Sequence, residues 1–210
     1  MNRKTFALAL AAAGMIASAL PSHAYRMIQN TGVGRFSAGA AVSCSASGGF
    51  THWNNKNIVW RLNTANQGSG KSTALSNAAA SWTNVSSANH VLSNGGTTTT
   101  GFSTNGTNTV LWASGNGCTG SCLAITALVL QSGQVIVESD ISFNNNVTWT
   151  TTGAQYDTEA VMAHEIGHSL GIHHSDVSST ATMYAYYFGS AGRSLASDDN
   201  AALQCAESRY

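Results

Sequence analysis

The feature that most constrains this chain is the run from 164 to 174, which reads His-Glu-Ile-Gly-His-Ser-Leu-Gly-Ile-His-His. In a helix of 3.6 residues per turn, a spacing of four places His164 and His168 on one face. His174 would lie roughly 9 Å further along a continued helix, so it can join them only if the chain turns. Gly171 predicts that turn, because glycine adopts the left-handed conformation that ends helices.

Three neutral imidazoles are the ligand set of a catalytic zinc site, because they leave a fourth position open for water. Glu165 lies next to a ligand but points elsewhere on the helix, so we expect it to act as general base. His173 has the wrong spacing from Gly171, and we predict no metal role for it. Gly167 predicts a close chain crossing, since glycine inside a helix costs about 1 kcal/mol relative to alanine.

The first 24 residues are typical of a secretory signal peptide: Arg3 and Lys4 precede an apolar run over 6–20, and 22–24 form a small-x-small cleavage site. We therefore expect a secreted protein, extracellular or periplasmic, with one domain. Nine acidic and seven basic side chains follow that segment, a net charge of −2. This balance argues against nucleic acid or anionic membrane as a partner, and we expect a monomer.

Four cysteines in an exported chain favour two disulfides. The most natural pairing joins Cys118 to Cys122 and Cys44 to Cys205, although the sequence leaves three connectivities open. Apart from the N-terminal segment, no apolar run approaches the roughly 20 residues that a membrane span requires.

Residues 25–55 have weak periodicity and are expected to be irregular, which places the start of the catalytic domain near residue 56. Alternating apolar residues then predict a strand at 58–62, and helical spacing behind a possible Ser72 cap predicts a helix over 72–90. Residues 93–121 are rich in Ser, Thr, Asn and Gly, which is typical of a surface loop. Further strands are predicted at 109–113, 123–130, 134–138 and 140–143.

A second helix, capped by Asp157 or Thr158, is predicted to run to about Leu170, with Met162 and Ile166 on its apolar row. A last helix begins near residue 197, with two acidic residues in its first turn. Several strands with few helices indicate an α+β fold.

At this point the sequence resembles the metzincins, and among them the matrix metalloproteases, or matrixins. The zinc motif is followed by Ser175, and residues 181–187, Ala-Thr-Met-Tyr-Ala-Tyr-Tyr, resemble the Met-turn of the family with Ala185 in place of proline. The resemblance covers about 56–206. It implies a metzincin domain over 56–210, with a twisted, mostly parallel mixed sheet, an active-site helix and a small C-terminal subdomain. It also implies that Met183 forms an apolar floor under the zinc.

The resemblance further implies a substrate cleft. Leu123 and Ala124 match the edge strand that pairs with substrate backbone. Ala160 is small and precedes the first zinc histidine by four residues, which implies a deep pocket for a large apolar side chain just after the scissile bond. Asp198 and Asp199 would brace the N-terminal segment and the Met-turn, or alternatively serve only as acids at a helix start.

Some positions depart from the family pattern. Ile125 and Ser142 stand where histidines of a structural zinc site are usual, and Asn144 and Val147 stand where calcium-binding carboxylates are usual. We therefore expect one catalytic zinc and neither structural zinc nor calcium. The latency motif of the family propeptide is also missing, and Cys44 could alternatively act as a thiolate plug on zinc.

The sequence thus predicts a secreted zinc endopeptidase acting on an extended polypeptide. One alternative is a metzincin dedicated to a single cell-envelope protein. Another is a zinc-dependent binding module without catalysis, against which Glu165 argues, because three histidines bind zinc without it.

Overall fold

The computed structural model describes residues 25–30, 32–66, 68–86, 88–176 and 178–209. The predicted signal peptide, residues 1–24, lies outside this part of the chain. Within the described residues, no helix has the length and apolar character that crossing a membrane requires.

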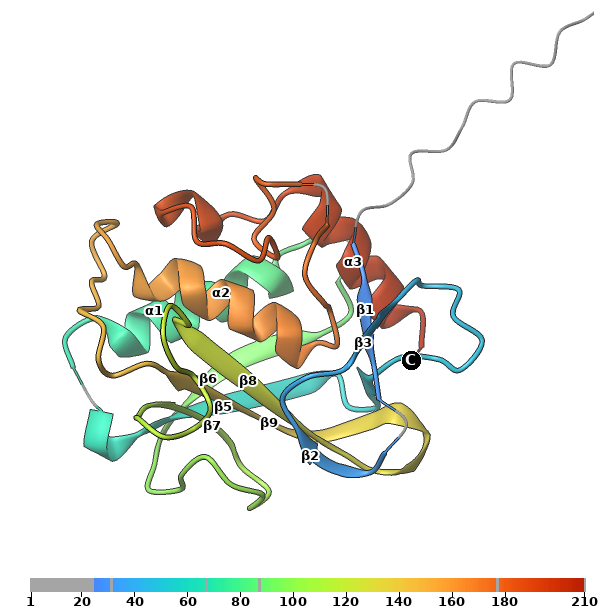
Figure 1. Ribbon diagram of the computed structural model, residues 1–210, viewed down its shortest axis with the longest axis horizontal. Coiled ribbons are helices and arrows are strands. Elements are labelled where there is room, and N and C mark those ends of the chain that lie inside the picture. Colours follow the sequence, from blue (N-terminus) through green and yellow to red (C-terminus); the bar gives the residue numbers. More distant parts are fainter. Residues whose placement is uncertain (1–24, 31, 67, 87, 177, 210) are drawn as a thin grey trace, which may run out of the picture.

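A mixed sheet forms one layer of the molecule (Figure 1). Its strands follow the order β2-β8-β9-β7-β5-β6, and β4 pairs with β9 off this path. Strand β8 is antiparallel to both neighbours, and the remaining pairs are parallel. The strands are β2 (Gly34–Phe36), β4 (His52–Trp53), β5 (Asn57–Asn63), β6 (Val91–Thr98), β7 (Asn108–Trp112), β8 (Ala124–Leu130) and β9 (Val135–Phe143).

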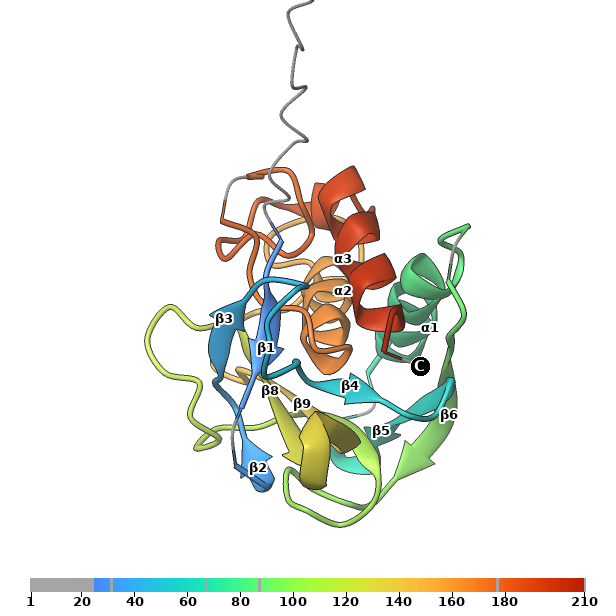
Figure 2. The ribbon, with the colours of Figure 1, turned by 90° about the vertical axis from the view of Figure 1, so that its right-hand side faces the viewer.

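Three helices lie on one side of this sheet, as the two ribbon views agree (Figures 1 and 2). They are α1 (Lys71–Thr83), α2 (Thr158–Ser169) and α3 (Ser197–Glu207). The described residues also form three short 3₁₀ turns, η1 (Thr64–Asn66), η2 (Ser132–Gln134) and η3 (Ser190–Arg193). This arrangement confirms the predicted α+β class.

The core forms where the helices meet the sheet. Strand β5 alternates between exposed and buried positions, as the sequence predicted, with Ile58, Trp60 and Leu62 turned inward. The apolar row of α2 is fully buried at Met162 and Ile166. Packing of this row against the sheet leaves the opposite side of α2 free to carry polar side chains.

The helix predicted over roughly 72–90 begins within one residue of its expected start, but its predicted Ser72 cap and its predicted end were wrong. Gly70, with φ of 80°, precedes α1, and the Ser72 oxygens accept a hydrogen bond from Asn94 instead of capping the helix. The helix ends at Thr83, and the chain further on is held elsewhere: Glu207 accepts hydrogen bonds from the backbone N–H groups of Asn89 and His90. The chain thus leaves the helical path after Thr83 and is fixed further on by a distant carboxylate.

Two other predictions need correction. The predicted surface loop at 93–121 contains most of β6, an edge strand whose polar residues face solvent, and all of β7. The separate strands at 134–138 and 140–143 form one strand, β9, because Ser139 lies inside the sheet beside Leu128 and keeps its backbone paired.

Residues 25–55, expected to be irregular, contain β1 (Met27–Gln29), β2, β3 (Ala40–Val42) and β4. Strands β1 and β3 pair with each other, whereas β2 and β4 join the main sheet. Because each strand has only two or three residues, periodicity does not reveal it.

Two disulfides join the pairs that the sequence analysis favoured, Cys44 to Cys205 and Cys118 to Cys122. The first closes a separation of 161 residues and ties the N-terminal segment to α3. Cys44 is therefore bonded, and no described cysteine is free. The thiolate-plug alternative for Cys44 is not supported.

Candidate active site

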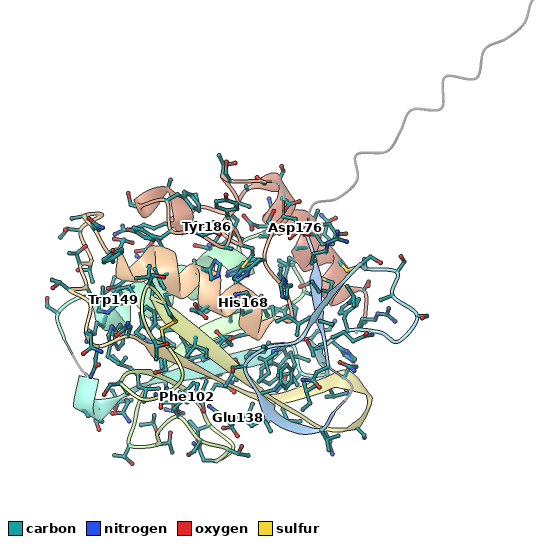
Figure 3. The ribbon with its side chains drawn as sticks, viewed as in Figure 1. Phe102, Glu138, Trp149, His168, Asp176 and Tyr186 are labelled. Carbon is teal, nitrogen blue, oxygen red and sulfur yellow. A yellow bond between two sulfur atoms is a disulfide. The ribbon has the colours of Figure 1, made fainter. Side chains whose placement is uncertain are left out.

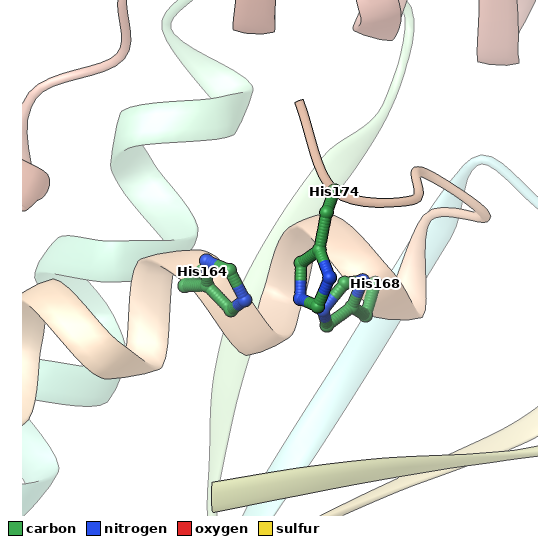
Figure 4. Close-up of side chains that lie close together, drawn as sticks. All are labelled: His164, His168 and His174. Carbon is green, nitrogen blue, oxygen red and sulfur yellow. The ribbon is translucent and has the colours of Figure 1, made fainter. Parts of the chain in front are cut away.

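Helix α2 carries the first two histidines of the motif. Its N-cap is Asp157, one of the two predicted candidates, and Asp157 Oδ1 accepts a hydrogen bond from the Ala160 N–H at 2.9 Å. His164 and His168 lie one turn apart with ring centroids 4.7 Å from each other. The predicted helix face is therefore present, and Figure 4 shows both rings on the same side of α2.

The turn after α2 brings His174 back to these rings. The Ile172 N–H bonds to the Gly167 carbonyl and the Gly171 N–H bonds to the His168 carbonyl, which together form a Schellman motif. Gly171 has φ of 85°, and a Cβ there would lie 2.1 Å from the Thr51 carbonyl oxygen. Only glycine meets both requirements without strain.

The three rings converge on one point (Figure 4). His168 and His174 have their Nε2 atoms 3.2 Å apart, and one nitrogen of each of the three rings falls within 4.8 Å of the others. Two nitrogens that each lie about 2 Å from a tetrahedral zinc are separated by roughly 3.3 Å. The donor set therefore fits one zinc ion.

Neighbouring groups prepare these rings for a metal. Carbonyl oxygens lie 2.7 Å from two Nδ1 atoms, Thr182 O from His164 and Ile172 O from His168. An Nδ1–H that donates to a carbonyl leaves the Nε2 lone pair free for the metal. Burial, together with the neighbouring histidines, lowers the pKa of His174 to about 4, so this ring is neutral near pH 7. Neutral imidazole is the form that binds metal.

Gly167 lies between the two helical histidines and allows a close approach. A Cβ at this position would lie 2.2 Å from Met183 Sδ and 2.8 Å from Trp82 Cζ2. The predicted crossing is therefore an approach of two side chains to the helix, with Met183 fully buried against it. The Met183 side chain therefore packs against α2 at Gly167, which lies between His164 and His168 in the sequence.

Asp199 holds the segment that carries Met183. Its carboxylate accepts hydrogen bonds from the N–H groups of Thr182 at 2.8 Å and Met183 at 3.0 Å. Asp198 accepts a hydrogen bond from Ser175 Oγ at 2.7 Å, next to His174. Both acids of the α3 start therefore contact the chain that surrounds the histidines.

Glu165 is buried beside the histidines. Thr126 donates its hydroxyl hydrogen to Glu165 Oε2 at 2.5 Å, and burial raises the pKa of this carboxyl against the lowering effects of His164 and Thr126. The sequence analysis missed Thr126. Its position on β8, two residues after Ala124, was the available signal, because alternate strand residues share a face.

A cleft of about 910 Å³ contains these groups. Leu123, Ala124 and Ala160 line it, as do the three histidines and Glu165. Two tyrosines, Tyr156 and Tyr187, were not predicted as cleft residues; their rings lie 5.4 Å apart at the end nearest Ala160. In Figure 3, Tyr186 lies above His168 and the strands of the sheet lie below it.

The positions that depart from the family pattern lie together on the sheet. Ile125 of β8 is the register partner of Ser142 of β9, and Ser142 Oγ accepts a hydrogen bond from Asn116. The Asn144 side chain donates a hydrogen bond from Nδ2 to the Cys122 carbonyl and accepts one at Oδ1 from the Asn146 N–H. Within the described residues, the three motif histidines form the one group of three or more His, Cys, Asp or Glu side chains that could hold a metal.

Comparison with known proteins agrees with this geometry. Residues 52–206, which carry the histidines, Glu165 and Met183, match the family model of the matrixins. The chain belongs to the matrixin family. This match covers most of the sequence and includes β4 to α3.

Curated relatives of this matrixin match it over a shorter stretch. Karilysin of Tannerella forsythia is 49% identical over 59 residues, 28% of this chain and 12% of the relative. Neutrophil collagenase of Homo sapiens is 46% identical over 63 residues, 30% and 13% of the two chains. Interstitial collagenase of Equus caballus is 39% identical over 69 residues, 32% and 14%. The aligned part thus spans about an eighth of the length of these relatives.

Proposed function

We propose that this matrixin is a secreted zinc-dependent endopeptidase that hydrolyses extended polypeptides. The observation that carries the proposal is the convergence of three imidazoles and one buried carboxylate in a single cleft. The donor set suits a catalytic zinc, and the carboxylate lies beside it. The two disulfides support an oxidising compartment.

In this proposal His164, His168 and His174 hold the zinc. A bound zinc ion lowers the pKa of water and polarises the scissile carbonyl. Glu165 accepts the proton of the attacking water at its carboxylate and returns it to the leaving amine. Thr126 holds the carboxylate in place, because its hydroxyl hydrogen bonds to Oε2.

Met183 acts in this proposal as an apolar support for the ligands. Its sulfur fills the space at Gly167 between His164 and His168, and its backbone is fixed by Asp199. The Thr182 carbonyl from the same segment orients the His164 ring. We propose one zinc per chain, without structural zinc or calcium, because uncharged groups occupy the positions that those ions would need.

The cleft also suits an extended peptide. Strand β8 offers its backbone along one wall, where Leu123 and Ala124 lie, and Ala160 leaves space beside α2. Addition of a peptide strand to a sheet edge provides affinity through main-chain hydrogen bonds, and side-chain pockets add selectivity.

A peptide mixture tests the proposal. The mature protein, beginning at Tyr25, is incubated with peptides of varied sequence, and mass spectrometry records the cleaved bonds. We expect internal bonds to be cleaved, cleavage to stop on zinc chelation, and added zinc to restore it. A chain that binds zinc but cleaves no peptide would support the binding-module alternative instead.

A further inference from the structure

Strand β8 has a short free edge. Strand β9 pairs with one side of β8 along its whole length, whereas β2 covers the outer side only at Leu128–Leu130. In the described part of the chain, no strand pairs with the outer side of 124–127. At 3.3 Å per residue, this free edge is about 13 Å long.

Side chains anchor β2 in this position. Arg35 places Nη1 2.9 Å from Asp140 Oδ2 and 3.9 Å from Glu138 Oε1, and both carboxylates are buried. The Arg35 guanidinium also lies 4.3 Å from the centre of the Phe102 ring. Phe102 and Glu138, which Arg35 approaches, are both labelled in Figure 3. Loss of Arg35 would leave two acids without their cation, so β2 is costly to remove.

The chain on both sides of β2 is also attached. Before it, the Ile28 N–H bonds to the Gly171 carbonyl and the Arg26 carbonyl accepts from the His173 N–H. After it, Cys44 is covalently bonded to Cys205. A peptide entering the cleft therefore meets β2 as a fixed wall.

Residues 36–39, which begin with the last residue of β2, line the cleft and form this wall. Ala160 lines the opposite end, near the start of α2. In the proposed function, the substrate residue just after the scissile bond lies by Ala160. The residues before that bond must then run along β8 toward Leu128, where β2 already pairs.

We propose that β2 ends the cleft on the N-terminal side of the substrate and limits pairing with β8 to about three residues before the scissile bond. Glu165 accepts a hydrogen bond from Thr126, so the scissile peptide bond lies level with the free edge of β8. Substrate residues that precede the scissile bond can then pair at most with the outer side of residues 125–127 of β8. The inference rests on the proposed function, from which the direction of the substrate is taken.

A peptide series tests this limit. One cleavable sequence is extended from one to six residues before the scissile bond, with the remainder constant. Each backbone hydrogen bond that the peptide forms with the free edge should raise kcat/KM about fivefold. We expect this gain up to about the third residue and a change within about twofold from the fourth to the sixth. A further gain of about tenfold or more over those last residues would overturn the proposal.

A second measurement does not depend on cleavage. Hydrogen exchange is recorded for segment 34–36 in zinc-loaded Glu165→Ala, with and without the six-residue peptide. Unchanged protection of β2 supports the proposal, whereas loss of protection would show that substrate displaces β2 and would overturn it. If the unmodified protein cleaves none of the peptides in the series, the proposed function is rejected, and the inference with it.

A variant links the limit to β2. Arg35→Gln weakens the anchor, and Arg61→Gln on the exposed side of β5 is the matched control with the same charge change. In Arg35→Gln, the amide hydrogens of β2 should exchange faster, and kcat/KM should rise about fivefold when the peptide is extended from the fourth to the sixth residue. Arg61→Gln should show neither change. Faster exchange of β2 without any such gain would overturn the role of β2. If Arg35→Gln does not fold, the two preceding measurements still decide.

Discussion

Gly171→Ala should weaken both the fold and the zinc site, for two separable reasons. A non-glycine residue at φ of 85° costs about 1–2 kcal/mol. The new Cβ would also lie 2.1 Å from the Thr51 carbonyl oxygen, a backbone atom that cannot rotate away. Displacement of packed backbone costs about 1–3 kcal/mol more. The expected loss in the free energy of unfolding is therefore about 2–5 kcal/mol, out of a typical 5–15.

Gly133→Ala is the matched control, because Gly133 has φ of 76° and an added Cβ would meet nothing within 4 Å. It should cost only the conformational part, about 1–2 kcal/mol. Urea unfolding of both variants without zinc gives the two losses. Zinc affinity, measured by competition with a chromophoric chelator, should fall at least about tenfold for Gly171→Ala alone, since this turn positions His174. Losses within about 0.5 kcal/mol of each other would refute the reasoning about Thr51.

Three further predictions follow. Burial acts to raise the pKa of Asp157, but hydrogen bonds from Arg193 and from backbone N–H groups hold this pKa below its usual value. The ionised carboxylate therefore stabilises the fold above about pH 4, and this stabilisation is lost as the pH falls through the lower pKa of the folded state. Asp157→Asn keeps a capping oxygen, so in thermal unfolding it should be less stable at pH 7 and less sensitive to acid below about pH 4. Peptides that differ only in the residue just after the scissile bond should be cleaved faster when this residue is Leu or Phe than when it is Ala. The reverse order would reject a deep pocket beside Ala160. Metal analysis should give about one zinc per chain and almost none in the His164→Ala, His168→Ala double variant, whereas retained zinc would reveal a second site.

The metal-binding part of the site could be predicted because local geometry determines it. A spacing of four on a helix fixes His164 and His168, and a left-handed glycine reverses the chain before His174. The N-cap at Asp157 follows from the same local rules, since its carboxylate bonds only three residues ahead.

Features that depend on distant contacts could not be predicted. The chain after α1 is held at Asn89 by Glu207, more than 110 residues away in sequence. Strand β2 has three residues, and its place beside β8 depends on Arg35 reaching two buried acids. The sequence could place Thr126 on the same strand face as Ala124, but its hydrogen bond to Glu165 forms only because α2 packs beside β8. In each case the deciding partner is fixed by the tertiary fold and not by neighbouring sequence.

The central claim is that Glu165 performs proton transfer beside a zinc held by other residues, and one comparison tests it directly. Zinc content and peptide cleavage are measured together for the unmodified protein and for Glu165→Gln, which keeps the shape of the side chain and can still accept the hydrogen bond from Thr126. We expect about one zinc in both proteins and a fall of at least about 10²-fold in kcat for the variant. Cleavage within about tenfold of the unmodified protein, with zinc retained, would contradict the assigned role of Glu165.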